Sequence, residues 1–219
     1  MTRLVVFDCD GTLVDGQAAI CGTMEQAFAA AGLPSPDRND VRRMVGLSLP
    51  QALHKLAPDS DAATHSQVVE AYKSLYRDMR VSGRLEEPLY EGIAALIERL
   101  HTGGTLLGVA TGKSDRGLRA CLASHGLTDH FVTLQTADRH PSKPHPSMLA
   151  EAMSDAGALP ANTIMIGDTS YDMEMAVAAG THAIGVAWGY HEPAELLAAG
   201  AHGVAQTMNE LEAMIDDRH

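Results

Sequence analysis

The chain has 219 residues, of which 45% are hydrophobic and 20% are charged, and its formal net charge is −12. This composition excludes an intrinsically disordered chain and allows one sizeable core with room for a second small domain. Because nucleic acids and anionic membranes are bound through clustered Lys and Arg, we expect neither to be the main partner of so acidic a chain. The apolar runs are also too short to span a bilayer.

Cysteine usage bears on the compartment in which the protein works. Cys9, Cys21 and Cys121 are far apart and form no CxxC pair, and no signal peptide is recognisable before the first apolar run. We therefore expect a cytoplasmic protein with reduced thiols. The histidines form neither HExxH nor a paired Cys/His spacing, so they predict no zinc site. The sequence carries no signal for the oligomeric state.

The first predicted strand, residues 3–8, ends at two carboxylates, Asp8 and Asp10, which are one residue apart. Like charges at such close range raise each other's pKa, so a positive side chain or a metal ion is expected beside them. The residues that follow superficially resemble a calcium loop, but Leu13 occupies the position that requires Gly and Ala19 that of the bidentate Glu. The alternative to a functional role is that these carboxylates cap a loop or a helix.

A long helical block follows the first strand. From about residue 17 to residue 81 the apolar periodicity is helical, and no strand is predicted. Because such a block is too long for an ordinary crossover, we predict a helical cap domain at residues 16–83. Residues 1–15 and 84–219 are then the core domain. The alternative is that these helices only pad the core.

The rest of the chain alternates short apolar runs with helical patterns. Continuous apolar runs predict buried strands at residues 105–111, 162–168 and 182–188, and helical patterns lie at 91–104, 115–127, 145–157 and 172–180. We therefore predict an α/β fold with a Rossmann-like, doubly wound parallel-sheet core. The helical cap is inserted after its first strand, and the crossovers are right-handed.

In open α/β sheets, ligands bind beyond the carboxyl ends of the strands. Asp8 and Asp10, Thr111 and Asp168 stand at three such ends, and Lys143 lies in a Pro-rich loop just before a helix. We expect these residues to meet on one rim of the sheet. The three carboxylates form an oxygen-rich set that suits Mg²⁺ rather than zinc, so Asp8, Asp10 and Asp168 are the predicted metal site.

This set of residues suits phosphoryl transfer. The carboxylate of Asp8 could attack phosphorus in line and form an aspartyl-phosphate. Asp10 could donate a proton to the leaving oxygen and later accept one from the attacking water. The hydroxyl of Thr111 and the backbone N–H of Gly112 could hold phosphoryl oxygens at the start of the next helix. Taken alone, ATGKS is also typical of a strand-to-helix turn with Ser114 as N-cap.

Two further residues could support this chemistry. Lys143 would balance the charge of Asp8 and of the phosphate, although an isolated Lys is usually exposed. Asp172 stands at a helix start, four residues after Asp168. It could anchor metal-bound waters or Lys143, or it could stabilise the helix dipole.

Four motifs in this order, DCDGT, ATGKS, SKPHP and GDTSYDM, resemble those of the haloacid dehalogenase superfamily. The resemblance implies a Rossmann-like core and Mg²⁺-dependent transfer through a phosphoaspartate. It implies that Asp8 is the nucleophile and Asp10 the acid/base, and that Thr111 and Lys143 bind phosphate. The implied metal ligands are Asp168, the Asp8 side chain and the Asp10 backbone carbonyl. The helical insertion resembles the cap of the phosphoglycolate phosphatase-like branch.

The resemblance therefore implies a phosphatase that acts on a small phosphorylated metabolite, with phosphoglycolate-like esters first in line. True haloacid dehalogenases lack the counterpart of Asp10, so dehalogenation is not expected. A sugar-phosphate mutase of the β-phosphoglucomutase type is the alternative, but Gly16 and Ile20 stand where the hinge residues of that group are expected. A binding protein without catalysis is a third reading, which the four intact motifs disfavour.

The cap is expected to close over the site, exclude water and contact the substrate. Within residues 42–50, Arg42 or Arg43 could meet a substrate anion, and Arg43 is the candidate specificity residue. The alternative is a helix end with two solvated Arg side chains.

Overall fold

The computed structural model describes residues 2–218 and contains a six-stranded parallel sheet with the strand order β3-β2-β1-β4-β5-β6. The strands are β1 (Leu4–Phe7), β2 (Leu106–Thr111), β3 (Phe131–Thr136), β4 (Thr163–Gly167), β5 (His182–Val186) and β6 (Gly203–Ala205). The predicted α/β fold with a Rossmann-like parallel sheet is confirmed. Four of the strands, β1, β2, β4 and β5, lie where the apolar runs predicted them.

The sequence analysis missed the two edge strands, β3 and β6. In β3, Phe131 is buried but Val132 is 53% exposed, and β6 has three residues. Edge strands are not covered as fully as central ones, so they lack the continuous apolar run by which buried parallel strands are identified.

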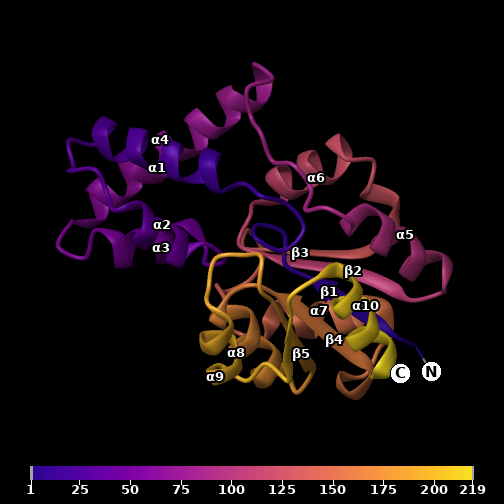
Figure 1. Ribbon diagram of the computed structural model, residues 1–219. Helices are drawn as coiled ribbons and strands as arrows, with labels where there is room; N and C mark the ends of the chain where they lie inside the picture. Colours follow the sequence, from indigo (N-terminus) through magenta and orange to yellow (C-terminus); the bar gives the residue numbers. More distant parts are fainter. Residues whose placement is uncertain (1, 219) are drawn as a thin grey trace.

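Helices cover both faces of the sheet (Figure 1). They are α5 (Ile93–Thr102), α6 (Asp115–Ser124), α7 (Ser147–Ala156), α8 (Ser170–Ala179), α9 (Pro193–Ala198) and α10 (Met208–Asp217), with short 3₁₀ helices at Thr128–His130 and Pro160–Asn162. Side chains of β1 alternate between the faces. Val5 and Phe7 pack in the cluster that includes residues of α5, α6 and α10, whereas Leu4 and Val6 pack in the cluster that includes residues of α7, α8 and α9.

Four helices follow β1 and form a block at one side of the sheet (Figure 1). They are α1 (Gln17–Ala30), α2 (Arg38–Met44), α3 (Leu49–Leu56) and α4 (Ala62–Val81), and they enclose an apolar cluster of their own. The short helix α2 lies within the segment that was predicted to be helical, although most of its residues are polar and its one buried residue is Val41. We refer to α1–α4 as the cap; the exact division at residues 15/16 and 83/84 remains a prediction.

The two segments that join the cap to the core run side by side. The backbone N–H of Asp15 donates to the carbonyl of Pro88 at 2.8 Å, and an antiparallel bridge pairs Val14 with Leu89. The chain therefore enters and leaves the cap at one place, next to the carboxyl end of β1.

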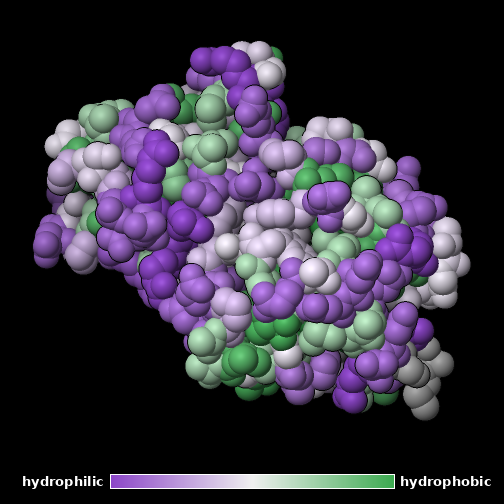
Figure 2. Space-filling view, viewed as in Figure 1, coloured by the Kyte–Doolittle hydropathy of each residue, from purple (hydrophilic) through white to green (hydrophobic). Residues whose placement is uncertain are grey.

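Hydrophilic residues cover most of the face shown in Figure 2, with small apolar patches between them. Among residues 2–218 there is no helix with the length and apolar character that crossing a bilayer requires.

Candidate active site

The carboxyl ends of the neighbouring strands β2, β1 and β4 bring together the side chains that the sequence analysis singled out. In the parallel register, Phe7 at the end of β1 lies level with Val109 of β2 and Ile166 of β4. All the predicted catalytic, phosphate-binding and metal side chains of the core are buried: Asp8, Asp10, Thr111, Lys143, Asp168 and Asp172.

Lys143 lies between two carboxylates. Its Nζ is 2.9 Å from Oδ1 of Asp8 and 2.6 Å from Oδ1 of Asp172, and none of the three side chains is exposed. Burial raises the pKa of Asp8 to about 7, although Lys143 opposes the shift. Burial would lower the pKa of Lys143, but the attraction of Asp172 and Asp8 outweighs it and raises that pKa. Lys143 therefore stays charged beside Asp8.

Asp172 has two structural functions at once. One carboxylate oxygen contacts Lys143, and the other accepts hydrogen bonds from the backbone N–H of Thr169 at 3.1 Å and from its hydroxyl at 2.7 Å. The bond from the Thr169 backbone N–H belongs to the capping box at the start of α8. Both sequence-based interpretations of Asp172, as an anchor of Lys143 and as a first-turn residue of a helix, therefore have a counterpart in the geometry.

Asp168 is held by donors from two other segments. Its Oδ1 accepts from the hydroxyl of Thr12 at 2.8 Å, and its Oδ2 accepts from the backbone N–H of Tyr190 at 2.9 Å. Gly11 has a φ of +85°, and a Cβ at this position would collide with the Asp168 carboxylate. The Gly of the first motif thus allows the loop after β1 to pass close to Asp168.

The buried carboxylates fit a divalent cation. One oxygen each from Asp8, Asp168 and Asp172 lies within 4.8 Å of the others, and Oδ2 of Asp8 is buried without a hydrogen-bond partner. Burial and the charges of Asp8 and Asp172 raise the pKa of Asp168. A hard cation held by oxygens of this cluster would relieve the repulsion between the carboxylates. The carboxylate of Asp10 is not part of this cluster.

Asp10 is paired instead with a residue that the sequence analysis missed. Lys113 Nζ lies 2.9 Å from Oδ1 of Asp10, as an ion pair without the alignment of a hydrogen bond. The same Nζ lies 2.5 Å from Oε1 of Glu87. Burial raises the pKa of Asp10, and Lys113 opposes this rise. The signal that was available is the position of Lys113 in ATGKS, two residues after Thr111.

Thr111 and Gly112 form the turn between β2 and α6. The Thr111 hydroxyl accepts from the backbone N–H of Lys113 at 3.3 Å. Helix α6 starts at Asp115, as predicted, and the side chain of its N-cap residue Ser114 accepts from Gly117 N at 3.1 Å. The turn therefore has the N-cap of an ordinary strand-to-helix connection, with the Thr111 hydroxyl at the strand end.

The cap contacts this turn through the loop between α2 and α3. A Cβ on Gly112 would lie 2.5 Å from the carbonyl oxygen of Leu47, and the backbone N–H of Ser48 donates to Oγ of Ser142 at 2.8 Å. Arg43, the predicted specificity residue, lies elsewhere: its Nη2 is 2.6 Å from Oε1 of Glu195, and its side chain is 49% exposed. The structure therefore does not bring Arg43 to the other site residues.

A cavity of about 780 Å³ lies between the cap and this edge of the sheet. On the core side its lining includes Asp8, Asp10, Thr111, Gly112 and Lys113. On the cap side it is lined by residues that include Met24, Val41, Met44, Leu49, Tyr72 and Tyr76. The carboxylates thus open onto a space that is large enough for a small organic molecule. Its cap side carries apolar residues and also charged ones, among them Lys73, Arg77 and Arg80.

This fold and site place the chain in a known class. The family model described as haloacid dehalogenase-like hydrolase matches residues 5–186, and the chain belongs to this family. "Probable phosphatase IndB" of Dickeya dadantii (strain 3937) is 36% identical over 214 residues, which cover 96% of this chain and 92% of that protein.

Further similarities lead to the same class. A phosphoglycolate phosphatase of Vibrio vulnificus (strain CMCP6) is 28% identical over 218 residues, with 95% of this chain and 94% of that protein covered. The crystal structure of a predicted phosphatase from Clostridium acetobutylicum has a TM-score of 0.88 and 26% identity, with 99% of each chain covered. The chain is accordingly a hydrolase of the phosphatase class, as the four motifs predicted.

Proposed function

We propose that this protein is a Mg²⁺-dependent phosphatase that hydrolyses a small phosphomonoester through a phosphoaspartate on Asp8. The observation that carries the proposal is the state of the Asp8 carboxylate, which lines the cavity. One oxygen is neutralised by Lys143, and the other is buried and has no partner. An unpartnered carboxylate oxygen at a cavity is available as a nucleophile.

In the first step, Oδ2 of Asp8 attacks phosphorus, and the bond to the ester oxygen breaks on the opposite side. Asp10, whose pKa is raised by burial, gives its proton to the departing oxygen. The hydroxyl of Thr111 and the backbone N–H of Gly112 donate to the phosphoryl oxygens, while Lys143 balances their negative charge.

In the second step, Asp10 takes a proton from a water molecule, which attacks the phosphorus of the phosphoaspartate. Free phosphate leaves, and Asp8 is a carboxylate again. Mg²⁺ would be held by Asp8, Asp168 and the backbone carbonyl of Asp10, with Asp172 supporting it from outside, and it would neutralise the charge of the phosphoryl group.

The proposed substrates are small phosphorylated metabolites, with phosphoglycolate-like esters first. The named phosphoglycolate phosphatase relative supports this choice, whereas the volume of the cavity leaves room for larger leaving groups. Neither nucleic acid nor a membrane is part of the proposed function. A cytoplasmic location is supported by the three cysteines, Cys9, Cys21 and Cys121, all of which are buried and free.

The test is phosphate release from a panel of small phosphomonoesters, with Mg²⁺ and with EDTA, using the wild type and Asp8→Asn. We expect metal-dependent release that is lost in the variant by at least ~10⁴-fold. Release that persists in Asp8→Asn would refute the phosphoaspartate. Conversion of glucose 1-phosphate to the 6-phosphate without net release of phosphate would instead identify the sugar-phosphate mutase.

A further inference from the structure

Lys113 is buried beside Asp10 but belongs to none of the roles described so far. Its side chain is 8% exposed, and its Nζ contacts Asp10 at 2.9 Å and Glu87 at 2.5 Å. The ring centroid of Tyr76 lies 5.6 Å from the same nitrogen. A buried ammonium is costly unless anions surround it, so these contacts hold Lys113 in one place.

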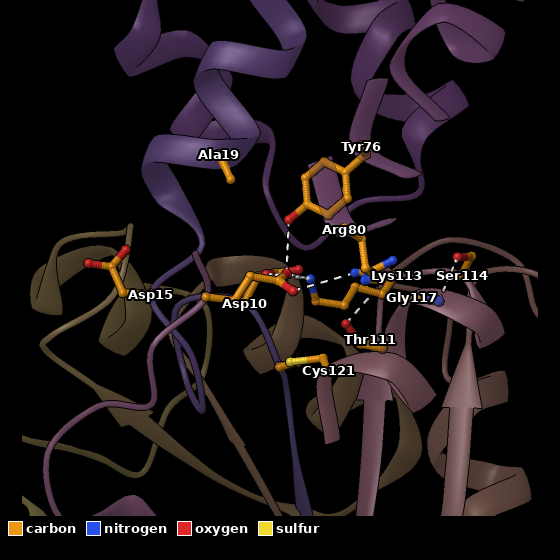
Figure 3. A network of polar contacts seen from close by, with 12 residues as sticks. Asp10, Asp15, Ala19, Tyr76, Arg80, Thr111, Lys113, Ser114, Gly117 and Cys121 are labelled. Atoms are coloured by element: carbon orange, nitrogen blue, oxygen red, sulfur yellow. Dashed lines mark hydrogen bonds and ion pairs between the residues drawn. The ribbon is translucent and has the colours of Figure 1, made fainter. Parts of the chain in front are cut away.

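Glu87 connects this lysine to the cap. It lies in the linker between α4 and α5, and its Oε1 accepts from the Tyr76 hydroxyl at 2.9 Å as well as from Lys113. Its Oε2 lies 3.4 Å from Nη2 of Arg80. Tyr76 and Arg80 both belong to α4. Figure 3 shows Tyr76 and Arg80 next to the pair formed by Asp10 and Lys113. One carboxylate therefore joins the cap helix, the linker and the core turn.

Asp10 depends on this arrangement for its position. Its Oδ1 is buried and makes no aligned hydrogen bond, so the ion pair with Lys113 is the contact that restrains this oxygen. Lys113 in turn is restrained by Glu87. A small displacement of a proton donor reduces its efficiency, because proton transfer requires hydrogen-bond distance to the leaving oxygen.

We propose that Lys113 is a positioning residue for Asp10, and that Glu87 and Tyr76 make this positioning depend on the cap helix α4. The proposal rests on the proposed function, in which Asp10 gives its proton to the leaving oxygen. The acid is then correctly placed while α4 lies against the linker. When α4 moves away, Glu87 loses its contacts with Tyr76 and Arg80, and Lys113 is less firmly held.

Leaving groups of different basicity separate positioning of the acid from a general structural role. A p-nitrophenolate departs without a proton, whereas an alkoxide needs one. We therefore compare kcat/KM, which covers the steps up to departure of the leaving group, for p-nitrophenyl phosphate and for the best alkyl phosphate. For Lys113→Met we expect a loss of ~10- to 100-fold with the alkyl ester and within ~3-fold with the aryl ester. Equal losses with both esters would overturn the proposal.

The link to the cap is tested by milder substitutions. Tyr76→Phe removes one hydrogen bond to Glu87, and Glu87→Gln weakens the contacts of this side chain with Lys113 and Arg80. For each variant we expect losses of ~2- to 10-fold that are again confined to the alkyl ester. If kcat/KM of both variants equals that of the wild type for the alkyl and the aryl ester, the dependence on α4 is refuted. Lys55→Met is the matched control on another cap helix, and its kcat/KM should be unchanged for both esters.

A double variant distinguishes the proposal from loss of folding and from failure of the proposed function. In an Asp10→Asn background, Lys113→Met should cost nothing further with the alkyl ester, because the residue to be positioned no longer carries a proton to donate. A further ~10-fold loss of kcat/KM when Lys113→Met is added to Asp10→Asn would refute the positioning role of Lys113. Activity of Asp8→Asn with either ester would refute the proposed function itself, whatever preference Lys113→Met shows.

Discussion

Two lysines with buried side chains lie beside Asp8 and Asp10, the two carboxylates that follow β1, and the surroundings of the two lysines differ. Lys143 lies between Asp8 and Asp172, at 2.9 and 2.6 Å, and all of these side chains are fully buried in the core. Lys143 lies in the loop between β3 and α7 and Asp172 in the first turn of α8, so both belong to the core rather than to the cap. The position of Asp8 is expected to be independent of where the cap lies.

The second lysine has a partner in the linker that leads back from the cap. Lys113 lies between Asp10 and Glu87, and Glu87 accepts from Tyr76 of the cap helix α4. The surroundings of the proposed acid/base therefore change if the cap moves. The Asp8–Lys143 and Asp10–Lys113 pairs therefore illustrate a site in which the position of the nucleophile is fixed by the core, whereas the position of the proton donor depends on whether the cap is closed.

The largest effect is expected from removal of the lysine in the core. Lys143→Met leaves Asp8 and Asp172 buried without a counter-charge, so the free energy of unfolding should fall by about 3–5 kcal/mol, and phosphate release should be lost. Denaturant unfolding and the phosphatase assay measure both. Lys113→Met should lose less stability, because the side chains of Lys113, Asp10 and Glu87 are 8%, 11% and 7% exposed rather than fully buried. Equal stability of the two variants would contradict the proposed difference between the Lys143–Asp8 pair, which is held by the core alone, and the Lys113–Asp10 pair, which depends on the cap.

Mg²⁺ should stabilise the folded protein by an amount that depends on pH, because the metal competes with a proton on Asp8. Burial raises the pKa of Asp8 from 3.8 to about 7 in the folded protein. The metal-free folded state therefore binds the extra proton between these values, and the stability from this group is lost as the pH rises through about 7. Since Mg²⁺ replaces the proton, Mg²⁺ should stabilise more at pH 8 than at pH 5, by up to about 2.7 kcal/mol at 100 times its Kd.

Thermal unfolding with and without Mg²⁺ at the two pH values measures this difference. The control is Asp8→Asn, in which the extra stabilisation at pH 8 should shrink. Stabilisation of equal size at both pH values would show that Asp8 is not the group that exchanges its proton for the metal.

A smaller effect is expected where the cap loop meets the core turn. In Gly112→Ala the new Cβ would lie 2.5 Å from Leu47 O and 2.8 Å from Gly46 O, and both are backbone atoms of the cap loop. The loop must shift, so kcat/KM should fall by roughly 10-fold. Gly22→Ala is the control, because a Cβ there meets no atom within 4 Å. Wild-type kinetics of Gly112→Ala would show that this close contact does not matter for turnover.

The smallest effect is expected at Arg43. Its ion pair with Glu195 is half exposed, and such pairs contribute less than about 1 kcal/mol to stability. Arg43→Ala should therefore leave the melting temperature and kcat/KM close to those of the wild type. A large rise of KM would instead support the contact with a substrate anion that the sequence predicted.

The placement of the core residues could be predicted from the sequence because it follows from the strands. Asp8, Asp10, Thr111 and Asp168 directly follow continuous apolar runs, and the ends of parallel strands share one edge of the sheet. Their burial and mutual distances agree with this prediction. Their catalytic roles remain predictions for the experiments above.

The pairing of Lys113 with Glu87 could not be predicted in this way. Glu87 lies in a linker without periodicity, and its partners come from the cap helix on one side and the core turn on the other. Their proximity depends on how the chain returns from the cap, which no local pattern encodes. The exposed position of Arg43 has the same origin, since its partner Glu195 lies 152 residues further along the chain.

The paired linkers beside Val14 and Leu89 have a consequence for how the molecule could change over time. The cap is an insertion between β1 and α5, and the bridge between Val14 and Leu89 holds the two ends of this insertion together. The entropy of closing a loop grows only with the logarithm of its length, so each doubling costs about 0.6 kcal/mol. A cap of another size could therefore replace this one at little cost to the core, and the range of accepted esters could diverge while the chemistry at the sheet edge is inherited unchanged.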